Sequence, residues 1–568
     1  MRVRAAGDAA LLVQAGTAPR GPARLRAAIV AEGFPGIADI IPGAETVLVV
    51  TVPGHPGLPE LAGRLRTLAS AVADVADGAE SADGAEDEAA EAEAVEIPVR
   101  YDGPDLAEVA EETALSPEEV IGRHAAAEYL VGWLGFSPGF GYLTGLDPAL
   151  QVPRRASPRT SVPAGSVAIA GPLAAVYPSA SAGGWRLLGR TTARLWDEHR
   201  EPPAVLAPGR RVRFRPVDET GDEPGLSPAR LAARTTARTT ARTTACTTAR
   251  PGPEPAAGPV IEVVRPGPLA LVADLGRPGY GHLGVPRSGA ADPDSLRLAN
   301  RLAGNPENAA GVELTLGGAV LRFGGPAWNA PFWIALTGAP APVRLDRGPG
   351  PGLGPGLGLG LADGSGLGVP FAVTAGATLT VGTPATGVRS YLAVRGGVTV
   401  PPVLGSRSRD TLSELGPAPL QAGDRLPVGG TGACALIVAD LAPQAAAVPG
   451  PAELRVVAGP RDDWFAPEAR YRLRTAVYRV TSDSNRSGLR LSGPDLPRAR
   501  DGELASEGMP LGALQVPPSG QPILFLADHP VTGGYPVIAV VVTADVGRAA
   551  QLRPGDPVRF RLVPGPIG

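Results

Sequence analysis

Residues 132–143 read Gly-Trp-Leu-Gly-Phe-Ser-Pro-Gly-Phe-Gly-Tyr-Leu. Glycines and a proline alternate here with aromatic residues, which predicts a sharp turn between short strands. In such a turn, backbone amides can face a cleft while the aromatic rings form its walls. Ordinary β-turn chemistry explains the segment equally well when it is taken alone, so the motifs around it decide its meaning.

Motifs of the same turn-rich kind surround this segment. Upstream, Ser116-Pro117-Glu118-Glu119 is a capping box with proline at the first helical position, which predicts a helix to about Ala127 with His124 near its end. An amphipathic helix is predicted just before it, over residues 105–113. Downstream come, in order, Pro153-Arg154, Ser157-Pro158-Arg159, residues 162–167, Val176-Tyr177-Pro178 and Gly183-Gly184-Trp185.

A second ordered series fills the C-terminal part of the chain. It consists of Asp274-Leu275-Gly276-Arg277, Gly284-Val285-Pro286, Ser288-Gly289, Asp292, Asn300, Gly304-Asn305, Glu313, residues 391–397, Gly405-Ser406-Arg407-Ser408, Gly459-Pro460-Arg461, Ser484-Asn485-Arg486, residues 512–518, Gly520-Gln521-Pro522 and Thr532-Gly533-Gly534-Tyr535-Pro536.

Taken in order, and with His124 and Tyr129, the first series resembles the B subunit of 5-oxoprolinase, in a family that includes the sporulation-kinase inhibitor and part of urea carboxylase. The second series resembles the C subunit of 5-oxoprolinase, of the biotin-dependent carboxyltransferase-like and allophanate hydrolase-like proteins. The chain therefore looks like a fusion of B and C. The resemblance implies a mainly β fold with α+β parts: a small N-terminal α/β domain followed by cyclophilin-like β-barrels, one in the B half and two in the C half.

Composition and periodicity divide the chain into five parts. Predicted strands over 9–13 and 46–51 and predicted helices over 23–32 and 59–73 indicate a small α+β domain, residues 1–78. An acidic flexible insertion (79–96) precedes a turn-rich β segment (97–217), which the resemblance implies is the B-half barrel. The repeat ARTTARTTARTTACTTAR marks a disordered Thr/Ala/Arg linker (218–258). Two β-barrel units are predicted over 259–568. Strands are predicted there from the apolar runs at 332–336, 435–438, 523–526, 537–542 and 558–562, and residues 348–368 are predicted to form a glycine-rich loop.

Composition excludes several kinds of chemistry. All 52 Lys+Arg residues are arginine, so the 568-residue chain has no lysine Schiff base, no lysine P-loop and no covalently attached biotin. A net charge of −4 and the lack of a 20-residue apolar run predict no nucleic-acid partner and no membrane span. Neither of the two cysteines lies in a sequence context typical of a catalytic nucleophile. No spacing of His, Cys and Asp residues indicates a metal site. A cytoplasmic protein is expected, and a homo-oligomer is compatible with the sequence.

The resemblance implies ATP-dependent opening of 5-oxoproline to L-glutamate with a third protein, the A subunit of that enzyme, so that ATP is used with that partner. Charge that develops on the lactam oxygen or a phosphate calls for arginines and backbone amides, and proton transfer calls for a base or acid. The substrate- or phosphate-binding candidates are Arg159, Arg277, Arg461, Arg486, Gln515, Thr532, Gly533, Gly534 and Tyr535, and the catalytic candidates are His124, Glu507 and Asp528.

Each catalytic candidate has a structural alternative. His124 can interact with the helix dipole and the terminal carbonyls, Asp528 can cap the turn that begins at Thr532, and Glu507 can form an ion pair with Arg486. Departures from the family pattern include Pro172-Leu173-Ala174, Ala182, Ala273 and Ser487.

Two other functions stay open. One is inhibition of a histidine kinase. The other is a carboxyltransferase that acts on urea or another amide with a separate biotin carrier.

Overall fold

The computed structural model describes residues 1–16, 20–78, 94–155, 157, 159–218, 258–325, 328–346, 367–437, 442, 450–500, 502 and 504–567. Most of the predicted acidic insertion, the Thr/Ala/Arg linker with Cys246 and the glycine-rich loop at 348–368 lie outside the described residues. In the part of the chain that is described, seven α-helices accompany many short strands. The prediction of a mainly β fold with barrels is confirmed: the described part has few helices and closed or nearly closed barrels.

The N-terminal unit is an antiparallel sheet covered by two helices. Apolar side chains of the helices, among them Leu25, Ile29 and Leu65, pack on the sheet around Leu11 and Val49. The predicted strands and helices of this unit are confirmed with shifts of a few residues at their ends. The sheet order is β1 (Val3–Ala5), β2 (Ala10–Gln14), β4 (Thr46–Thr51) and β3 (Ile37–Pro42), and the helices are α1 (Gly21–Glu32) and α2 (Leu58–Gly78).

The B-half barrel is a seven-stranded sheet whose two edge strands meet. A bridge between Arg100 and Arg190 joins the ends of β5 and β12, so the sheet closes on itself. Both predicted helices are confirmed, and the Ser116–Glu119 capping box is formed. The order is β12 (Arg186–Arg190), β9 (Ser166–Ala170), β10 (Leu173–Val176), β7 (Gly141–Thr144), β6 (Tyr129–Leu134), β13 (Arg211–Pro216) and β5 (Val95–Val99), with the helices α4 (Leu106–Thr113) and α5 (Pro117–Ala126), the 3-10 turn η1 (Pro148–Leu150) and a hairpin of β8 (Arg159–Val162) and β11 (Ser181–Gly183).

The first C-half unit consists of two five-stranded sheets around one apolar core. A bridge between Val398 and Val428 joins the two sheets at one margin. One sheet has the order β19 (Val343–Asp346), β21 (Thr378–Val381), β17 (Ala319–Gly324), β14 (Val260–Arg265) and β23 (Arg425–Pro427). The other has the order β15 (Leu269–Ala273), β16 (Gly311–Thr315), β22 (Arg389–Val394), β18 (Phe332–Gly338) and β20 (Pro370–Val373), against which α7 (Pro293–Leu302) packs.

The second C-half unit is a closed seven-stranded barrel. The predicted strands over 537–542 and 558–562 are confirmed as members of it. Its order is β24 (Ala452–Ala458), β31 (Val537–Val541), β28 (Ala513–Gln515), β29 (Ile523–Phe525), β26 (Gly488–Ser492), β25 (Tyr478–Val480) and β32 (Pro557–Leu562), and it carries the 3-10 turn η3 (Asp462–Trp464), the helices α8 (Pro467–Thr475) and α9 (Thr543–Ala550) and the small pair β27 (Glu507–Gly508) and β30 (Thr532–Gly533).

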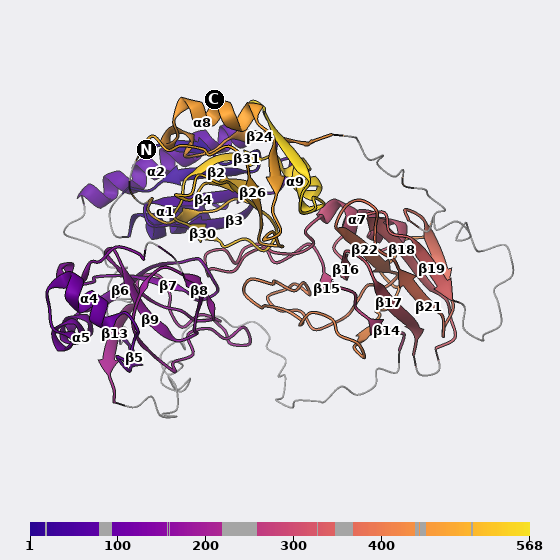
Figure 1. Cartoon of the computed structure of the whole chain (residues 1–568), viewed down its shortest axis with the longest axis horizontal. Helices are drawn as coiled ribbons and strands as arrows, with labels where there is room; N and C mark the ends of the chain where they lie inside the picture. Colours follow the sequence, from indigo (N-terminus) through magenta and orange to yellow (C-terminus); the bar gives the residue numbers. More distant parts are fainter. Residues whose placement is uncertain are drawn as a thin grey trace.

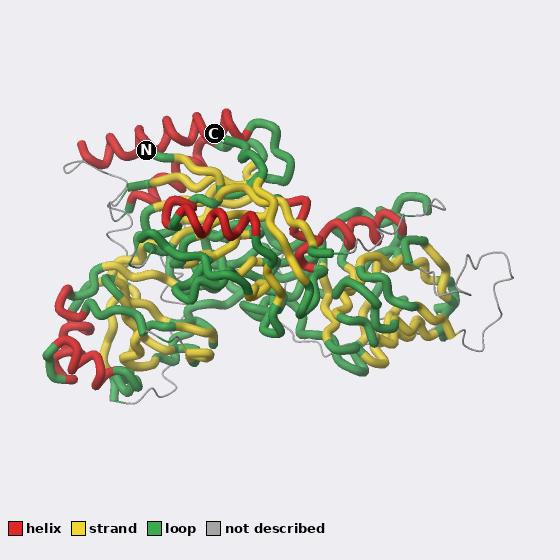
Figure 2. Tube along the Cα trace, turned by 45° about the horizontal axis from the view of Figure 1, so that its top comes forward, coloured by secondary structure: helices red, strands yellow, loops and turns green. Residues whose placement is uncertain are grey.

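The two ends of the chain lie together. The N-terminal sheet packs on the closed barrel, while the B-half barrel and the first C-half unit extend to either side (Figures 1 and 2). Ala6, Leu12 and Leu48 share an apolar cluster with Val531 of the C-terminal unit. Two polar contacts reinforce this packing: Arg4 pairs with Asp463 at 3.0 Å, and Asp8 accepts the backbone N–H of Thr543 at 2.9 Å. The N-terminal domain of the B half therefore packs directly against the C-terminal barrel of the C half.

The predicted strand at 435–438 is wrong over the residues that are described. Residues 435–437 belong to no strand, and Leu436 is 88% exposed. The segment is held as a loop because the backbone N–H of Ala435 bonds to Gly304 O at 2.7 Å and its carbonyl accepts Arg395 Nη1 at 2.7 Å.

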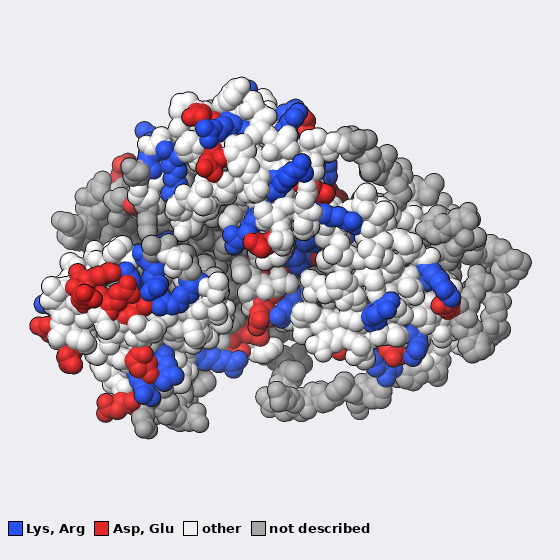
Figure 3. Space-filling model, in the orientation of Figure 1, with Lys and Arg blue, Asp and Glu red and all other residues white. Residues whose placement is uncertain are grey.

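Surface charges of opposite sign lie side by side. On the face seen in Figure 3, basic and acidic groups are interspersed. Arg213, for example, bonds Glu128 at 3.0 Å, and both side chains are exposed. None of the helices that the structure describes is long and apolar enough to cross a lipid bilayer.

Candidate active site

A cavity of about 390 Å³ lies between the B-half barrel and the closed C-terminal barrel. Its volume falls within the range of small-molecule sites. One wall comes from the turn-rich segments of the B half and the other from those of the C half. The lining residues are Phe136, Phe140, Tyr142, Arg154, Arg155, Tyr177, Gly183, Gly184, Trp185, Arg498, Gly502, Ser506, Gln515, Pro518, Pro530, Thr532, Gly533, Gly534 and Tyr535.

The B-half wall is aromatic. Phe140 meets Tyr177 and Trp185 edge to face, with ring centroids 5.2 and 5.7 Å apart, and Tyr142 stacks on Trp133 at 4.6 Å. Antiparallel pairing of β6 and β7 brings Trp133 opposite Tyr142. Edge-to-face and stacked contacts fix ring orientations, so the wall is a preformed apolar surface. The sequence interpretation of this segment as the aromatic wall of a cleft fits the structure.

The tip of the B-half turn is held by the C half. Phe136 has a φ of 63°, a left-handed conformation that costs free energy outside glycine, and its backbone N–H donates to Thr532 Oγ1 at 2.8 Å. The hydroxyl of Tyr142 lies 3.4 Å from the same Oγ1. A Cβ at Gly135 would lie 2.5 Å from Thr532 Oγ1, so only glycine permits this approach. Thr532 therefore fastens the aromatic wall to the opposite half.

The C-half wall carries five residues that the sequence predicted for binding: Gln515, Thr532, Gly533, Gly534 and Tyr535. Gln515, at the end of β28, donates from Nε2 to the carbonyl of Tyr535 at 3.2 Å. A Cβ on Gly533 would lie 2.7 Å from that Nε2, which explains why glycine is needed there. Strand pairing thus brings this motif together, and its role in binding stays a prediction.

The charged groups of the lining are arginines. Arg154 and Arg155 come from the B half and Arg498 from the C half, and none of the described lining residues is Asp, Glu or His. Burial raises the pKa of Tyr142 and of Tyr177, so both phenols keep their protons at neutral pH and can act as hydrogen-bond donors. The described lining therefore favours an anionic ligand with a flat apolar body.

A second group of predicted residues lies elsewhere, in a buried ion cluster between the two C-half units. Arg486 of the closed barrel contacts Glu313 of the first unit and bonds Asp528 at 2.8 Å. Asp528 also accepts the hydroxyls of Ser288 and Thr411, each at 2.6 Å. We call Glu313, Arg486 and Asp528, with these two hydroxyls, the ion cluster. Asp528 therefore bonds across this interface, which differs from the predicted alternative of a cap on the Thr532 turn.

Burial and neighbouring charges shift the pKa values of the carboxyl groups in and beside the ion cluster. Burial alone would raise the pKa of Asp528, but the Arg486 charge outweighs it and holds that pKa below its usual value. Burial and the nearby Asp528 charge raise the pKa of Asp410 to about 6. The predicted residue Arg277 is also buried near this cluster and donates to the carbonyl of Ser408 at 2.5 Å. Asp528, Arg486 and Arg277 are thus not cavity-lining residues.

The other acidic and basic candidates form separate ion pairs. Glu507 pairs with Arg461, with Nε and Oε2 2.9 Å apart, so the predicted Glu507–Arg486 pair is wrong. Arg159 bonds Asp105 at 2.6 Å on the B-half barrel. Neither pair lines the cavity.

His124 lies in the core of the B-half barrel. It is fully buried, stacks on Phe214 with centroids 4.6 Å apart, and its Nδ1 lies 2.8 Å from the hydroxyl of Tyr101. Burial lowers its pKa to about 3, so the ring is neutral at physiological pH. A neutral ring does not carry the positive charge that would favour a helix C-terminus. The structure does not bring His124 to the cavity.

Several lining residues were not among the predicted site residues. Arg154 belongs to the Pro153-Arg154 motif, but the sequence analysis assigned it no role in binding. Its position after a proline, among turn motifs, was the only feature of the sequence that pointed to the cavity. Arg155, Arg498 and Ser506 had no signal in the sequence, because distant segments bring them to the cavity. Among the described residues, no group of three His, Cys, Asp or Glu side chains could hold a metal ion.

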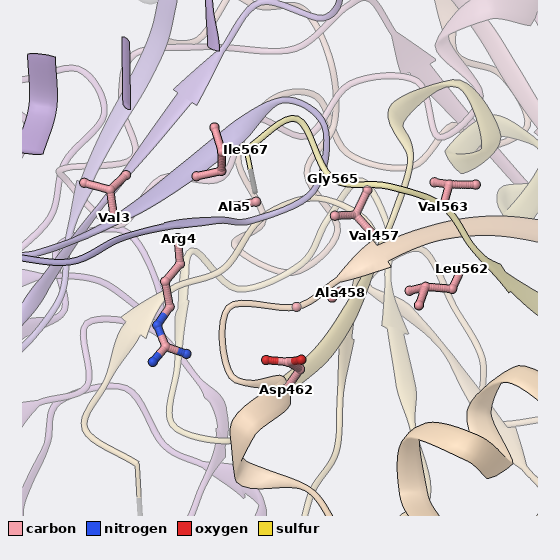
Figure 4. Close-up of a pocket in the computed structure, with 11 residues that line it drawn as sticks. Val3, Arg4, Ala5, Val457, Ala458, Asp462, Leu562, Val563, Gly565 and Ile567 are labelled. Carbon is pink, nitrogen blue, oxygen red and sulfur yellow. The ribbon is translucent and has the colours of Figure 1, made fainter. Parts of the chain in front are cut away.

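A second hollow, of about 350 Å³, lies where β1, β24 and the C-terminal segment meet (Figure 4). Its lining is mostly apolar, with Val3, Val457 and Ile567 around it, and Arg4 and Asp462 are its charged members. It contains none of the predicted site residues, which leaves the cavity between the halves as the candidate active site.

Family models match both halves of the chain. "Carboxyltransferase domain, subdomain C and D" matches residues 1–206, and "Carboxyltransferase domain, subdomain A and B" matches residues 283–562. The chain belongs to the carboxyltransferase-domain family. In this family member the subdomains come in the order C, D, A, B.

Relatives of the two halves are separate proteins. The C subunit of 5-oxoprolinase from Escherichia coli (strain K12) is 36% identical in an alignment of 312 residues, which covers 53% of this chain and 90% of that protein. The B subunit of 5-oxoprolinase from Escherichia coli O157:H7 is 51% identical over 137 residues, 23% of this chain and 63% of that protein. The chain is thus a carboxyltransferase-domain protein that fuses a B-like and a C-like half.

Of two further similarities, one covers nearly the whole chain and the other about half of it. The crystal structure of TTHA0988 has a TM-score of 0.76 and 34% identity, and the match covers 99% of this chain and 100% of that one. Urea amidolyase of Lachancea kluyveri is 32% identical in an alignment of 334 residues, which covers 53% of this chain and 17% of that enzyme. The arrangement of the halves described above therefore has a counterpart in a solved structure.

Proposed function

We propose that this chain is the B/C component of an ATP-dependent 5-oxoprolinase, which opens 5-oxo-L-proline to L-glutamate together with a separate A subunit. The observation that carries the proposal is the cavity with one wall from each half. The relatives of these halves are named as subunits of one enzyme. A site shared between the two halves would require both of them for turnover.

The charge of the cavity supports this substrate. 5-Oxoproline is an anion at neutral pH with a flat five-membered lactam ring, and three arginines and an aromatic wall line the cavity. An anion gains from the arginines, and the ring gains from contact with Phe140 and Trp185. Urea is neutral and has no apolar face, so it matches these groups less well.

The chemistry assigns different tasks to this chain and its partner. Lactam opening needs a carbonyl activated by phosphorylation, a water molecule and a proton acceptor. In this chain, the phenolic O–H groups of Tyr142 and Tyr177 can donate to a carbonyl or phosphoryl oxygen, and the arginines can stabilise the charge that develops there. The chain has no lysine for a P-loop, which supports ATP binding by the A subunit.

The test is reconstitution. The full chain is purified with and without its A-subunit homologue, and glutamate and ADP formed from 5-oxoproline and ATP are measured. We expect both products in equal amounts only in the mixture. Absence of turnover, with the partner folded and bound, would contradict the proposal.

A second candidate is a carboxyltransferase that acts on urea or a related amide with a separate biotin carrier. The similarity of about half of this chain to urea amidolyase favours it. The discriminating assay supplies carboxylated biotin carrier and urea to the same preparation. Formation of a carboxylated urea without glutamate formation from 5-oxoproline would favour this candidate over the first.

A further inference from the structure

The side chain of Arg154 crosses the boundary between the halves. It comes from the B half, in the segment after η1, and its guanidinium lies against the Gly533–Gly534 turn of the C half. A Cβ built on Gly534 would lie 3.0 Å from Arg154 Nη1 and 3.5 Å from Nη2. The glycine therefore gives the guanidinium room to lie close to the backbone of the opposite wall.

The same guanidinium acts on the phenols of the aromatic wall. Burial raises the pKa of Tyr142 and of Tyr177, and the Arg154 charge opposes this shift at both hydroxyls. On the B-half side, a Cβ on Gly183 would lie 2.3 Å from the hydroxyl of Tyr177, so this glycine also makes room for a polar group. One cation and two phenols thus face one part of the cavity.

The other two arginines of the lining have different surroundings. Arg155 pairs with Asp105 at 3.0 Å and Glu108 at 3.2 Å, at the outer surface of the B-half barrel. Arg498 donates to the carbonyl of Val516 at 2.7 Å, and its guanidinium lies over the Tyr535 ring at 5.7 Å. Of the three arginines in the described lining, Arg154 is the one whose charge acts on both phenols of the cavity.

We propose that Arg154 is the specificity-determining residue of the cavity: its guanidinium binds the carboxylate of a small cyclic amide, whose ring lies on the wall of Phe140 and Trp185. A planar guanidinium binds a carboxylate through two parallel hydrogen bonds, which fix the direction of the ligand as well as its charge. The inference rests on the proposed function for the identity of the ring, and on the lining residues for the carboxylate.

The experiment compares an anion with its neutral isostere. Binding of 5-oxo-L-proline and 5-oxo-L-prolinamide to the full chain is measured by calorimetry for the wild type, Arg154→Gln, Arg154→Lys and Arg498→Gln. We expect the wild type to prefer the carboxylate by roughly 10- to 100-fold, the range for a charged hydrogen-bond pair. Arg154→Gln should remove that preference while it leaves binding of the amide within about twofold. Arg154→Lys should restore part of it.

The control is Arg190→Gln, a change at an exposed residue of the same barrel, which should keep the wild-type preference. Thermal unfolding of each variant shows that it is folded. Equal weakening of both ligands by Arg154→Gln, or loss of the preference in Arg498→Gln alone, would overturn the inference and leave the proposed function standing. A folded wild type that binds neither ligand, alone or with the A subunit, would overturn the proposed function and the inference with it.

Discussion

The cavity and the ion cluster are two interfaces that use the same residue types in opposite ways. In the ion cluster, Arg486 is 3% exposed and is matched by two carboxylates, Glu313 and Asp528. In the cavity, arginines line an open space together with aromatic rings and glycines. Paired buried charges fasten two units, whereas arginines beside an apolar wall can receive a ligand. Asp528, which the sequence predicted as a catalytic residue, therefore lies in an interface that holds two units together.

The largest effect on stability is expected from a substitution that breaks the ion cluster. Asp528→Ala removes one of the carboxylates that neutralise Arg486 and leaves two hydroxyls without their acceptor. Loss of one partner of a buried pair costs about 3–5 kcal/mol. Urea unfolding should show a loss of stability of that size. If Asp528 were catalytic, the variant would instead keep its stability and lose turnover.

The next effect concerns His124, a buried polar group outside both interfaces. Its folded pKa of about 3 lies below the ordinary value of 6.5, so the unfolded chain binds the extra proton as the pH falls. The stability that this group contributes is full above pH 6.5 and is lost as the pH falls toward 3. The loss is about 1.4 kcal/mol per pH unit at most, or about 3 kcal/mol between pH 6.5 and 4.

His124→Gln should remove this part of the pH dependence, as measured by urea unfolding at several pH values between 4 and 7. Turnover per folded molecule in the reconstituted enzyme should stay near that of the wild type, because the ring does not line the cavity. A pH-independent fall in turnover at unchanged stability would return His124 to the group of catalytic residues.

A smaller effect tests the cavity. Thr532→Val keeps the shape of the side chain but leaves the Phe136 N–H without its acceptor, which costs about 1–3 kcal/mol. We expect KM for 5-oxoproline to rise by roughly tenfold because the aromatic wall loses its fastening, with a smaller change in kcat. Thr532→Ser retains the hydroxyl and should recover most of the wild-type KM. Equal KM values for the serine and valine variants would show that the hydroxyl does not position the wall.

The smallest effect on stability is expected for an exposed ion pair, which serves as a reference for the buried ion cluster. The ion pair between Arg561 and Glu453 spans 2.7 Å, as close as the buried pairs, but both side chains are about half exposed. Glu453→Gln should change stability by less than about 1 kcal/mol, since water screens exposed pairs. A loss as large as that of Asp528→Ala would mean that burial is not what distinguishes the ion cluster.

Local patterns predicted the fold well. The capping box from Ser116 to Glu119 and the apolar run at 46–51 depend on residues next to each other, so the helix α5 and the strand β4 were found at or near their observed ends. The glycine pairs at 183–184 and 533–534 stood in predicted turn motifs, and in the structure Gly183, Gly533 and Gly534 each have a close neighbour.

Partners that lie far apart in the sequence could not be predicted. Arg486 and Glu313 are separated by 173 positions, and no spacing rule connects them. His124 was placed correctly at the end of its helix, but its burial depends on Phe214 from β13, which only the closed barrel brings near. The choice between a catalytic and a core histidine was therefore a question of tertiary packing.

The packing of the first strands on the last barrel sets the order in which the chain can complete its fold. Gly7 lies so close to Val540 that a Cβ would be 2.8 Å from Val540 Cγ1, and Leu48 shares its cluster with Val531. A ribosome adds about 5–20 residues per second, so this surface of the N-terminal sheet waits for about 30–100 s before its cover has been synthesised. During that time a chaperone or a neighbouring nascent chain can occupy it, and the yield of folded protein should depend on the speed of translation.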